Sequence, residues 1–197
     1  MSATPLTPTL ESQWTLPSRG IVGMLCLIAA ESAIFIIFVV AYLFYIGKSV
    51  SGPMPKDVLE LPVFATICLL SSSITIHLAI SALRREKQGA FSLWWFVTFA
   101  LGAIFLTATG TEWRHLIYDK GLTIRTNLFG TTYYSLVGLH ASHVTVGLVL
   151  LLTVLIFSLL GKVRSEDKER LDVLSYYWHF VDAVWVVVFF VVYIVGR

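Results

Sequence analysis

Charged side chains are scarce in this chain of 197 residues, and their scarcity excludes most soluble architectures. Asp, Glu, Lys and Arg make up 13% of the residues, whereas hydrophobic residues make up 57%. Soluble domains carry roughly a quarter of charged residues. The formal net charge of only +2 also argues against a nucleic-acid partner, because such partners select concentrated positive charge. The composition therefore predicts an integral membrane protein that does not bind nucleic acid.

Cysteine is rare as well, and no metal-type or redox-type cysteine spacing occurs. Cys26 and Cys68 lie inside separate apolar runs, at different expected depths, so we expect no disulfide between them. The first 18 residues, MSATPLTPTLESQWTLPS, lack the basic and then apolar order of a signal peptide. We expect residues 1–18 to form a mobile polar tail, and residues 19–197 to form a transmembrane domain.

Long apolar runs are what the chain does contain. A bilayer core about 30 Å thick requires roughly 20 residues of apolar helix. Five stretches meet this length, and the breaks between them contain prolines, glycines or clusters of charge. The expected spans are about 21–46, 61–83, 91–112, 131–160 and 173–195. The predicted fold class is therefore all-α, a polytopic membrane bundle of five transmembrane helices.

The basic residues predict an orientation for this bundle. The tail and the second and fourth connections carry eight of the 14 Lys and Arg residues, and the other side carries six. Basic residues in short segments favour the cytoplasmic side of a membrane. We therefore expect the N-terminus inside and the C-terminus outside. Since spans and short connections use nearly all of the chain, any function must lie between the helices.

Ionisable residues inside the spans are the first candidates for function, because each costs at least about 3 kcal/mol in a bilayer. We expect them to be buried, in a structural or a proton-related role. The candidates are Glu31, His77, Glu112, His140, His143, His179 and Asp182. Each also has a plainer interpretation, in which polar seams of the helices meet and bond across the gap.

Small and aromatic residues predict where helices pack. Gly102 and Gly147 lie on the polar seams of their spans, where a small residue lets two helices approach closely. Trp178 and Trp185 lie two turns apart on the face of Asp182, so we expect them to pack against a partner helix. Other aromatics near span ends are expected in interfacial belts. This belt set is Trp94, Trp95, Trp113, Tyr133, Tyr134, Tyr176, Tyr177 and Trp178.

The depth of each residue along its span limits which candidates can meet. Glu31 lies about ten residues into its span and His143 about twelve into its own, so both are expected near mid-membrane. A hydrogen bond from Glu31 to His143 or His140 is therefore possible. His179 and Asp182 are expected together on the inner half of the membrane.

Two alternatives with chemistry of their own follow from the spacings. Glu112-x-x-His115 has the spacing that di-iron bundles use, and His140-x-x-His143 resembles a histidine box of membrane desaturases. A di-metal site would require these ligands at one depth, which their places in the spans disfavour. His179 and Asp182, three residues apart, could instead form a proton relay or simply anchor their helix.

Five segments together resemble one family. SYYWHFVDAVWVVVFFVVYIVG, over residues 175–196, resembles the last helix of subunit III of the haem-copper terminal oxidases. TTYYSLVGLHASHVTVGL resembles the preceding helix of that family, with Ala141 in place of a second glycine. LIAAESAIF resembles the segment that carries the family's intramembrane glutamate, here Glu31. LLSSSITIHLA and LGAIFLTATGTEWRHLI resemble the two helices between them. The resemblance covers the chain from about Arg19 to its end, in the short bacterial form.

The resemblance implies a supporting role in a respiratory oxidase. A subunit III binds no haem and no copper, so no catalytic, cofactor or metal residue is expected in this chain. Its implied partners are subunit I, which reduces oxygen to water and pumps protons, subunit II, a small subunit IV and membrane lipids, including a bound phospholipid. The implied location is the bacterial cytoplasmic membrane. The resemblance favours the cytochrome c oxidase branch, with a quinol oxidase subunit III as the alternative.

Overall fold

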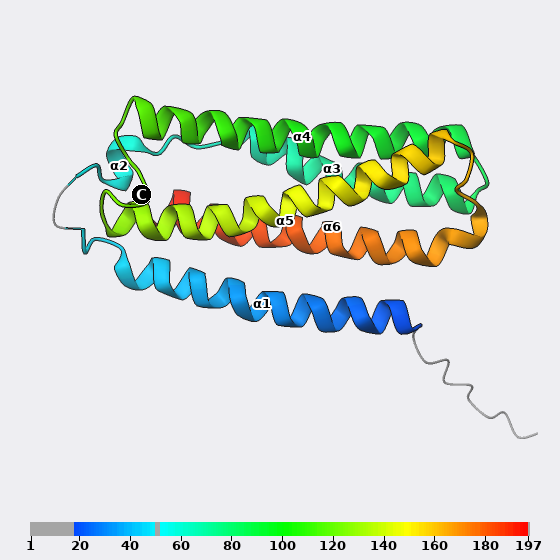
Figure 1. The fold of residues 1–197 in the computed structure, drawn as a ribbon, viewed down its shortest axis with the longest axis horizontal. Helices are drawn as coiled ribbons and strands as arrows, with labels where there is room; N and C mark the ends of the chain where they lie inside the picture. Colours follow the sequence, from blue (N-terminus) through cyan, green and yellow to red (C-terminus); the bar gives the residue numbers. More distant parts are fainter. Residues whose placement is uncertain (1–17, 50–51, 197) are drawn as a thin grey trace, which may run out of the picture.

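The computed structural model describes residues 18–49 and 52–196, and the helices in this part of the chain form one bundle (Figure 1). The tail expected over residues 1–18 therefore lies outside the described residues, apart from Ser18. The helices are α1 (Arg19–Tyr45), α2 (Pro55–Val58), α3 (Val63–Arg84), α4 (Gln88–Tyr118), α5 (Leu128–Leu159), the short 3-10 helix η1 (Ser165–Asp167), α6 (Lys168–Phe189) and its π-helical continuation η2 (Phe190–Val195).

Five of these helices are long and apolar enough to cross a membrane: α1, α3, α4, α5, and α6 with η2. The prediction of five spans and an all-α fold is confirmed, since the described residues contain no strand. The boundaries differ most at α4, which continues to Tyr118, six residues past its expected end at Glu112. The apolar run marks the part inside the bilayer, whereas the backbone hydrogen bonds of a helix continue past the bilayer core.

Local signals set the helix ends. The Ser18 hydroxyl accepts a hydrogen bond from the amide of Ile21 at the start of α1, and the Asn127 side chain accepts one from Gly130 at the start of α5. These side chains satisfy amides that have no partner within the helix. Just past the ends of α1 and α5, Gly47 and Gly161 adopt φ values of +73° and +67°, the left-handed conformation that glycine supplies at helix C-termini.

The helices form a four-helix core with α1 on its outside (Figure 1). Helix α3 packs against α4 and α6, α5 packs against α4 and α6, and α1 packs against α5 and α6. The most apolar 18 residues of α1 are only 6% buried, compared with 44% for the corresponding stretch of α6 and η2. Most of the surface of α1 therefore remains open to lipid or to another chain.

Two close helix contacts occur where a glycine faces the ring of Trp178. A Cβ atom on Gly102 of α4 would lie 2.8 Å from the Trp178 ring, and one on Gly147 of α5 would lie 2.7 Å from the same ring. The Trp178 indole donates a hydrogen bond of 2.8 Å to Ser72 of α3, and Trp185 donates one of 3.1 Å to Thr66. As expected, both tryptophans pack between helices, and the two glycines make room for Trp178.

Candidate functional site between the helices

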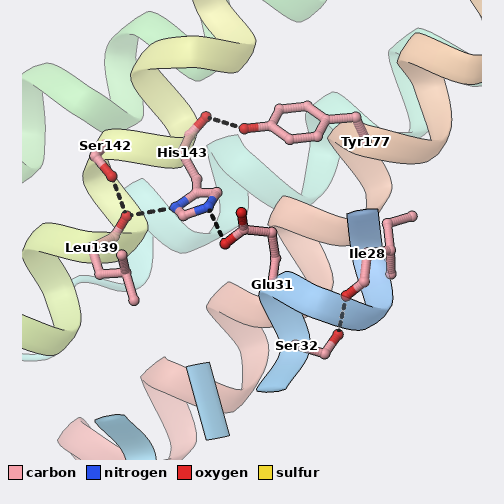
Figure 2. A network of polar contacts seen from close by, with 7 residues as sticks. All are labelled: Ile28, Glu31, Ser32, Leu139, Ser142, His143 and Tyr177. Carbon is pink, nitrogen blue, oxygen red and sulfur yellow. Dashed lines mark hydrogen bonds and ion pairs between the residues drawn. The ribbon is translucent and has the colours of Figure 1, made fainter. Parts of the chain in front are cut away.

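The first polar cluster joins α1 to α5 through Glu31 and His143 (Figure 2). His143 Nε2 lies 3.2 Å from Glu31 Oε2, and His143 Nδ1 lies 2.8 Å from the carbonyl oxygen of Leu139. The Tyr177 hydroxyl of α6 donates a hydrogen bond of 3.1 Å to the His143 carbonyl oxygen. Of the two hydrogen bonds that the shared depth makes possible for Glu31, the one to His143 is present and the one to His140 is not, and Tyr177 links the pair to a third helix.

The hydrogen bonds of His143 determine how many protons the pair holds. A carbonyl oxygen only accepts, so Nδ1 must donate its proton to Leu139. In a neutral ring, Nε2 is then an acceptor, and Glu31 must be protonated to donate to it. If Glu31 is instead ionised, the ring must carry protons on both nitrogens. In either state, one proton lies between the carboxyl group and the ring.

This pair lies at the edge of the bundle and not in its centre. The side chains of His143 and Glu31 are 15% and 24% exposed, and the Phe35 ring packs 5.0 Å from the His143 ring. A recess of about 250 Å³ opens beside them between α1, α5 and α6. It is lined by Leu27, Glu31, Ser142, His143, Val146 and Tyr177. The proton of the pair is thus close to a surface that another molecule can reach.

A second cluster joins α3 to α6. The Ser73 hydroxyl donates a hydrogen bond to Asp182 Oδ2, and Ser73 Oγ lies 3.0 Å from His179 Nδ1. Because Ser73 has one proton and gives it to Asp182, its oxygen accepts from His179. Asp182 is buried, with 3% exposure. His179 and Asp182 are therefore brought together, as their spacing predicts, but through a serine of the neighbouring helix.

His77 corrects the expectation that every ionisable candidate is buried. Its side chain is exposed on the surface of α3. The buried face of α3 includes Ser72, Ile76 and Ala79, and His77 lies about 100° around the helix from Ile76. The stripe through Ser73 and His77 follows the edge of that face, where α6 covers the serine but leaves the histidine open.

A third cluster surrounds Glu112 near the end of α4. The hydroxyls of Tyr193 and Tyr133 donate to Glu112 Oε1 over 2.9 Å and 3.3 Å. His115 lies apart from this cluster and pairs with Asp119 at 2.6 Å. Residues of α5 and η2 therefore both bond to one carboxylate of α4. Glu112 and His115 bind different partners, so this Glu-x-x-His pair does not form a shared metal-binding position.

His140 occupies the centre of the bundle. Its side chain has 0% exposure and stacks on Trp185, with ring centroids 5.0 Å apart, while Phe105 meets it edge to face. Within residues 18–49 and 52–196, neither ring nitrogen has a hydrogen-bond partner. His140 and His143 are one turn apart, yet His140 contacts the aromatic core whereas His143 contacts α1.

The metal alternative requires ligands that converge. Among the described residues, no group of three or more His, Cys, Asp and Glu side chains is placed to hold a metal ion. Glu112, His115, His140 and His143 instead contact four different sets of neighbours. The expected absence of a metal or cofactor in this chain stays a prediction.

Sequence reasoning missed the tyrosines of these clusters. Tyr133 was expected in an interfacial belt but is fully buried against Glu112, and Tyr193 was not singled out at all. Four other residues expected in the belt are also buried: Trp95, Trp178, Tyr134 and Tyr177, with 0%, 1%, 9% and 6% exposure. A tyrosine near a span end serves equally well in a belt or as a donor to a buried acceptor, so only the rotation of the helix decides between the two.

The fold and its polar clusters together define a class: a polytopic α-helical membrane protein in which most intramembrane ionisable side chains meet neighbouring helices in separate clusters. The comparison with known families is more specific. The family model described as cytochrome c oxidase subunit III matches residues 15–197. The chain belongs to the cytochrome c oxidase subunit III family, and it is therefore part of a multisubunit terminal oxidase.

Individual relatives agree with this assignment. The chain is 36% identical to the cytochrome c oxidase subunit 3 of Synechocystis sp., over 98% of this chain and 87% of the relative. It is 33% identical to the protein of that name from Alkalihalophilus pseudofirmus, over 96% and 93%. It is also 32% identical to the cytochrome bo(3) ubiquinol oxidase subunit 3 of Pseudomonas aeruginosa, over 88% and 84%.

Proposed function

We propose that this chain is an accessory subunit of a proton-pumping cytochrome c oxidase and has no redox centre of its own. Haem and copper would belong to subunits I and II, with subunit I as the main contact and a small subunit IV as a further neighbour. The chain would support the assembly, the stability and the proton uptake of subunit I while oxygen is reduced to water.

The observation that carries the supporting role is the Glu31–His143 pair. Its carboxyl group and its ring share one proton at the edge of the bundle, beside a recess of about 250 Å³. A group at this place can exchange a proton with a neighbouring subunit without any metal or cofactor in this chain. The clusters around Asp182 and Glu112 join helices, which suits a subunit whose main task is structural.

The test is to replace Glu31 by alanine in the complete oxidase. We expect an initial rate of oxygen consumption close to that of the unmodified complex, but slower proton uptake and fewer turnovers before activity is lost. Glu169→Ala is the matched control, because it removes the same kind of side chain from an exposed position in the first turn of α6. An immediate and complete loss of oxygen reduction, with haem and copper contents unchanged, would contradict a supporting role.

The electron donor is proposed to be cytochrome c. Relatives named for cytochrome c and for ubiquinol both match this chain, so the donor requires its own experiment. The purified complex should consume oxygen with reduced cytochrome c and much more slowly with ubiquinol. The reverse preference would place the chain in a quinol oxidase and would leave the supporting role intact.

We also propose the bacterial cytoplasmic membrane as the location, with the N-terminus inside. The basic residues of the second and fourth connections support this orientation. In a variant without Cys26 and Cys68, a cysteine at Lys162 should resist a membrane-impermeant maleimide added to whole spheroplasts, whereas one at Lys120 should react. The opposite labelling pattern would reverse the orientation.

A further inference from the structure

His77 lies exposed on the surface of α3, unlike the other ionisable candidates of the spans. Of the seven candidates, the other six are buried or half-buried. Within residues 18–49 and 52–196, neither ring nitrogen of His77 has a hydrogen-bond partner. Hydrocarbon offers no donor or acceptor, so an ionisable side chain in a span almost always faces protein or a water-filled cavity. The exposed ring therefore indicates a surface that another protein covers.

The position of His77 along α3 places it inside the bilayer core. Helix α3 has 22 residues, which at about 1.5 Å per residue gives a length of about 33 Å, close to the thickness of the core. Both ends of α3 therefore lie near the surfaces of the core. His77 precedes Arg84, the last residue of α3, by seven residues, and so lies about 10 Å inside. Because headgroups lie outside the core, a lipid headgroup is a poor partner for this ring.

His179 of α6 lies at the same depth and close to His77. Arg84 pairs with Asp172 of α6 at 3.0 Å, and His179 follows Asp172 by the same seven residues that separate His77 from Arg84. The two rings are close enough for their charges to interact. Because Nδ1 of His179 donates to Ser73, its Nε2 is an acceptor in the neutral ring. In the described part of the chain, no hydrogen bond reaches this Nε2.

Exposed apolar residues flank the two histidines. Ile74 and Leu70 lie one and two turns before His77 on α3 and are 65% and 39% exposed. Ala183 is exposed one turn after His179 on α6, and a small residue at this place lets another helix approach closely. We call these five residues the histidine face. It combines the apolar surface of a helix contact with two rings that lack a partner.

We propose that the histidine face binds a transmembrane helix of a neighbouring oxidase subunit, and that this helix supplies an Asp or Glu side chain to both rings. A carboxyl group suits the pair, because it can donate its proton to Nε2 of His179 and accept a hydrogen bond from His77. Within this chain, Glu31 bonds to Nε2 of His143 in the same way. The proposal rests on the proposed accessory role beside other subunits, but not on proton uptake through Glu31.

Photo-crosslinking in the purified complete oxidase tests which molecule covers the histidine face. The photoreactive residue p-benzoylphenylalanine replaces Ile74 in one variant and Ile37 of α1 in the control, because both residues are 65% exposed in this chain. We expect position 74 to link to another subunit, on a transmembrane helix that carries Asp or Glu at the depth of His77, and position 37 not to reach that helix. A link to lipid alone, a link to a helix without a carboxyl group, or the same link from both positions would overturn the proposal.

Two substitutions of His77 separate an interface role from a role in folding. His77→Leu removes the hydrogen bonds but suits an apolar surface, so it should not lower the unfolding temperature of the full chain in mild detergent. It should increase the dissociation of the chain from the complex about tenfold. His77→Gln keeps a donor and an acceptor and should preserve most of the association. Dissociation insensitive to His77→Leu, or an equal loss with both variants, would overturn the proposal. Neither experiment involves Glu31, so these results can hold even if the Glu31→Ala test contradicts the supporting role.

Discussion

The contact between Gly102 and Trp178 allows a sharp test of how tightly these helices pack. A Cβ atom on Gly102 would lie 2.8 Å and 2.9 Å from two carbons of the Trp178 ring and 3.0 Å from a methyl carbon of Leu148. Real Cβ atoms rarely come so close to another atom. The ring cannot turn away freely, because its Nε1 donates to Ser72. Gly102→Ala must therefore push α4 away from α5 and α6.

The size of the effect follows from two opposing contributions. Overpacking a well-filled core costs about 1–3 kcal/mol, and alanine stabilises a helix over glycine by about 0.5–1 kcal/mol. Gly110 lies two turns further along the same helix, and a Cβ atom added there would have no neighbour within 4 Å. Gly110→Ala therefore gains the helix contribution without the clash, and the two variants should differ by about 1–3 kcal/mol.

The buried thiol of Cys68 provides the assay. Cys68 is 7% exposed and free, whereas Cys26 is exposed. In a Cys26→Ser background, a thiol-reactive fluorescent dye reports unfolding through Cys68 as the full chain is heated in mild detergent. We expect Gly102→Ala to unfold at a lower temperature than Gly110→Ala. The additional change Trp178→Phe should remove most of that difference. The carbons closest to Gly102 belong to the six-membered ring of the indole, and the shorter phenylalanine side chain does not reach as far.

Equal midpoints for Gly102→Ala and Gly110→Ala would refute this reasoning. That result would mean that the helices shift apart at no cost, and the interpretation of Gly102 as a packing position would fail. A difference that persists in the Trp178→Phe background would locate the clash elsewhere, for example at Leu148.

Two further predictions concern the polar clusters and use the same assay. Ser73→Ala should destabilise the chain by about 1–3 kcal/mol, because buried Asp182 loses its hydroxyl donor. Asp182→Asn in the Ser73→Ala background should recover part of the lost stability. No recovery would argue against the hydrogen bond from Ser73 to Asp182. Tyr193→Phe should lower the stability of the chain by about 1 kcal/mol, because Tyr193 donates a hydrogen bond to Glu112. The same change at Tyr133 should lower it less, because Tyr133 makes the longer bond. A larger effect at Tyr133 would reverse the assigned roles of the two tyrosines.

The depth of a residue in the membrane could be predicted from the sequence, whereas the rotation of each helix about its own axis could not. Each residue advances a helix by about 1.5 Å, so counting from the span ends placed Glu31 level with His143, and the two do bond. His77 was counted to a depth just as easily, yet it faces outward. Lipid-facing and core-facing surfaces of these helices are both apolar, so the hydrophobic pattern that orients helices in soluble proteins is weak here.

The hydrogen-bond partners of the polar groups could not be predicted from the sequence, because they come from helices that are distant along the chain. Ser73 bridges His179 and Asp182 from a helix more than 100 positions earlier in the chain, and Tyr193 reaches Glu112 across 81 positions. No local spacing encodes such contacts. The glycines were predictable as packing positions, because small residues let two helices approach closely. The identity of the ring that fills the space could not be predicted.

Helix α1 is only slightly buried against the rest of the bundle. Glu31 therefore also has a structural role in fixing the rotation of this helix, besides any role in proton transfer. Apart from Phe35 and Tyr42, no residue of α1 is buried, so apolar packing distinguishes the sides of this helix only at these two positions. The bond from Glu31 to His143 is directional, and turning α1 by a single residue would break it. Together with buried Phe35 and Tyr42, this one carboxyl group thereby sets which side of the first helix faces outward.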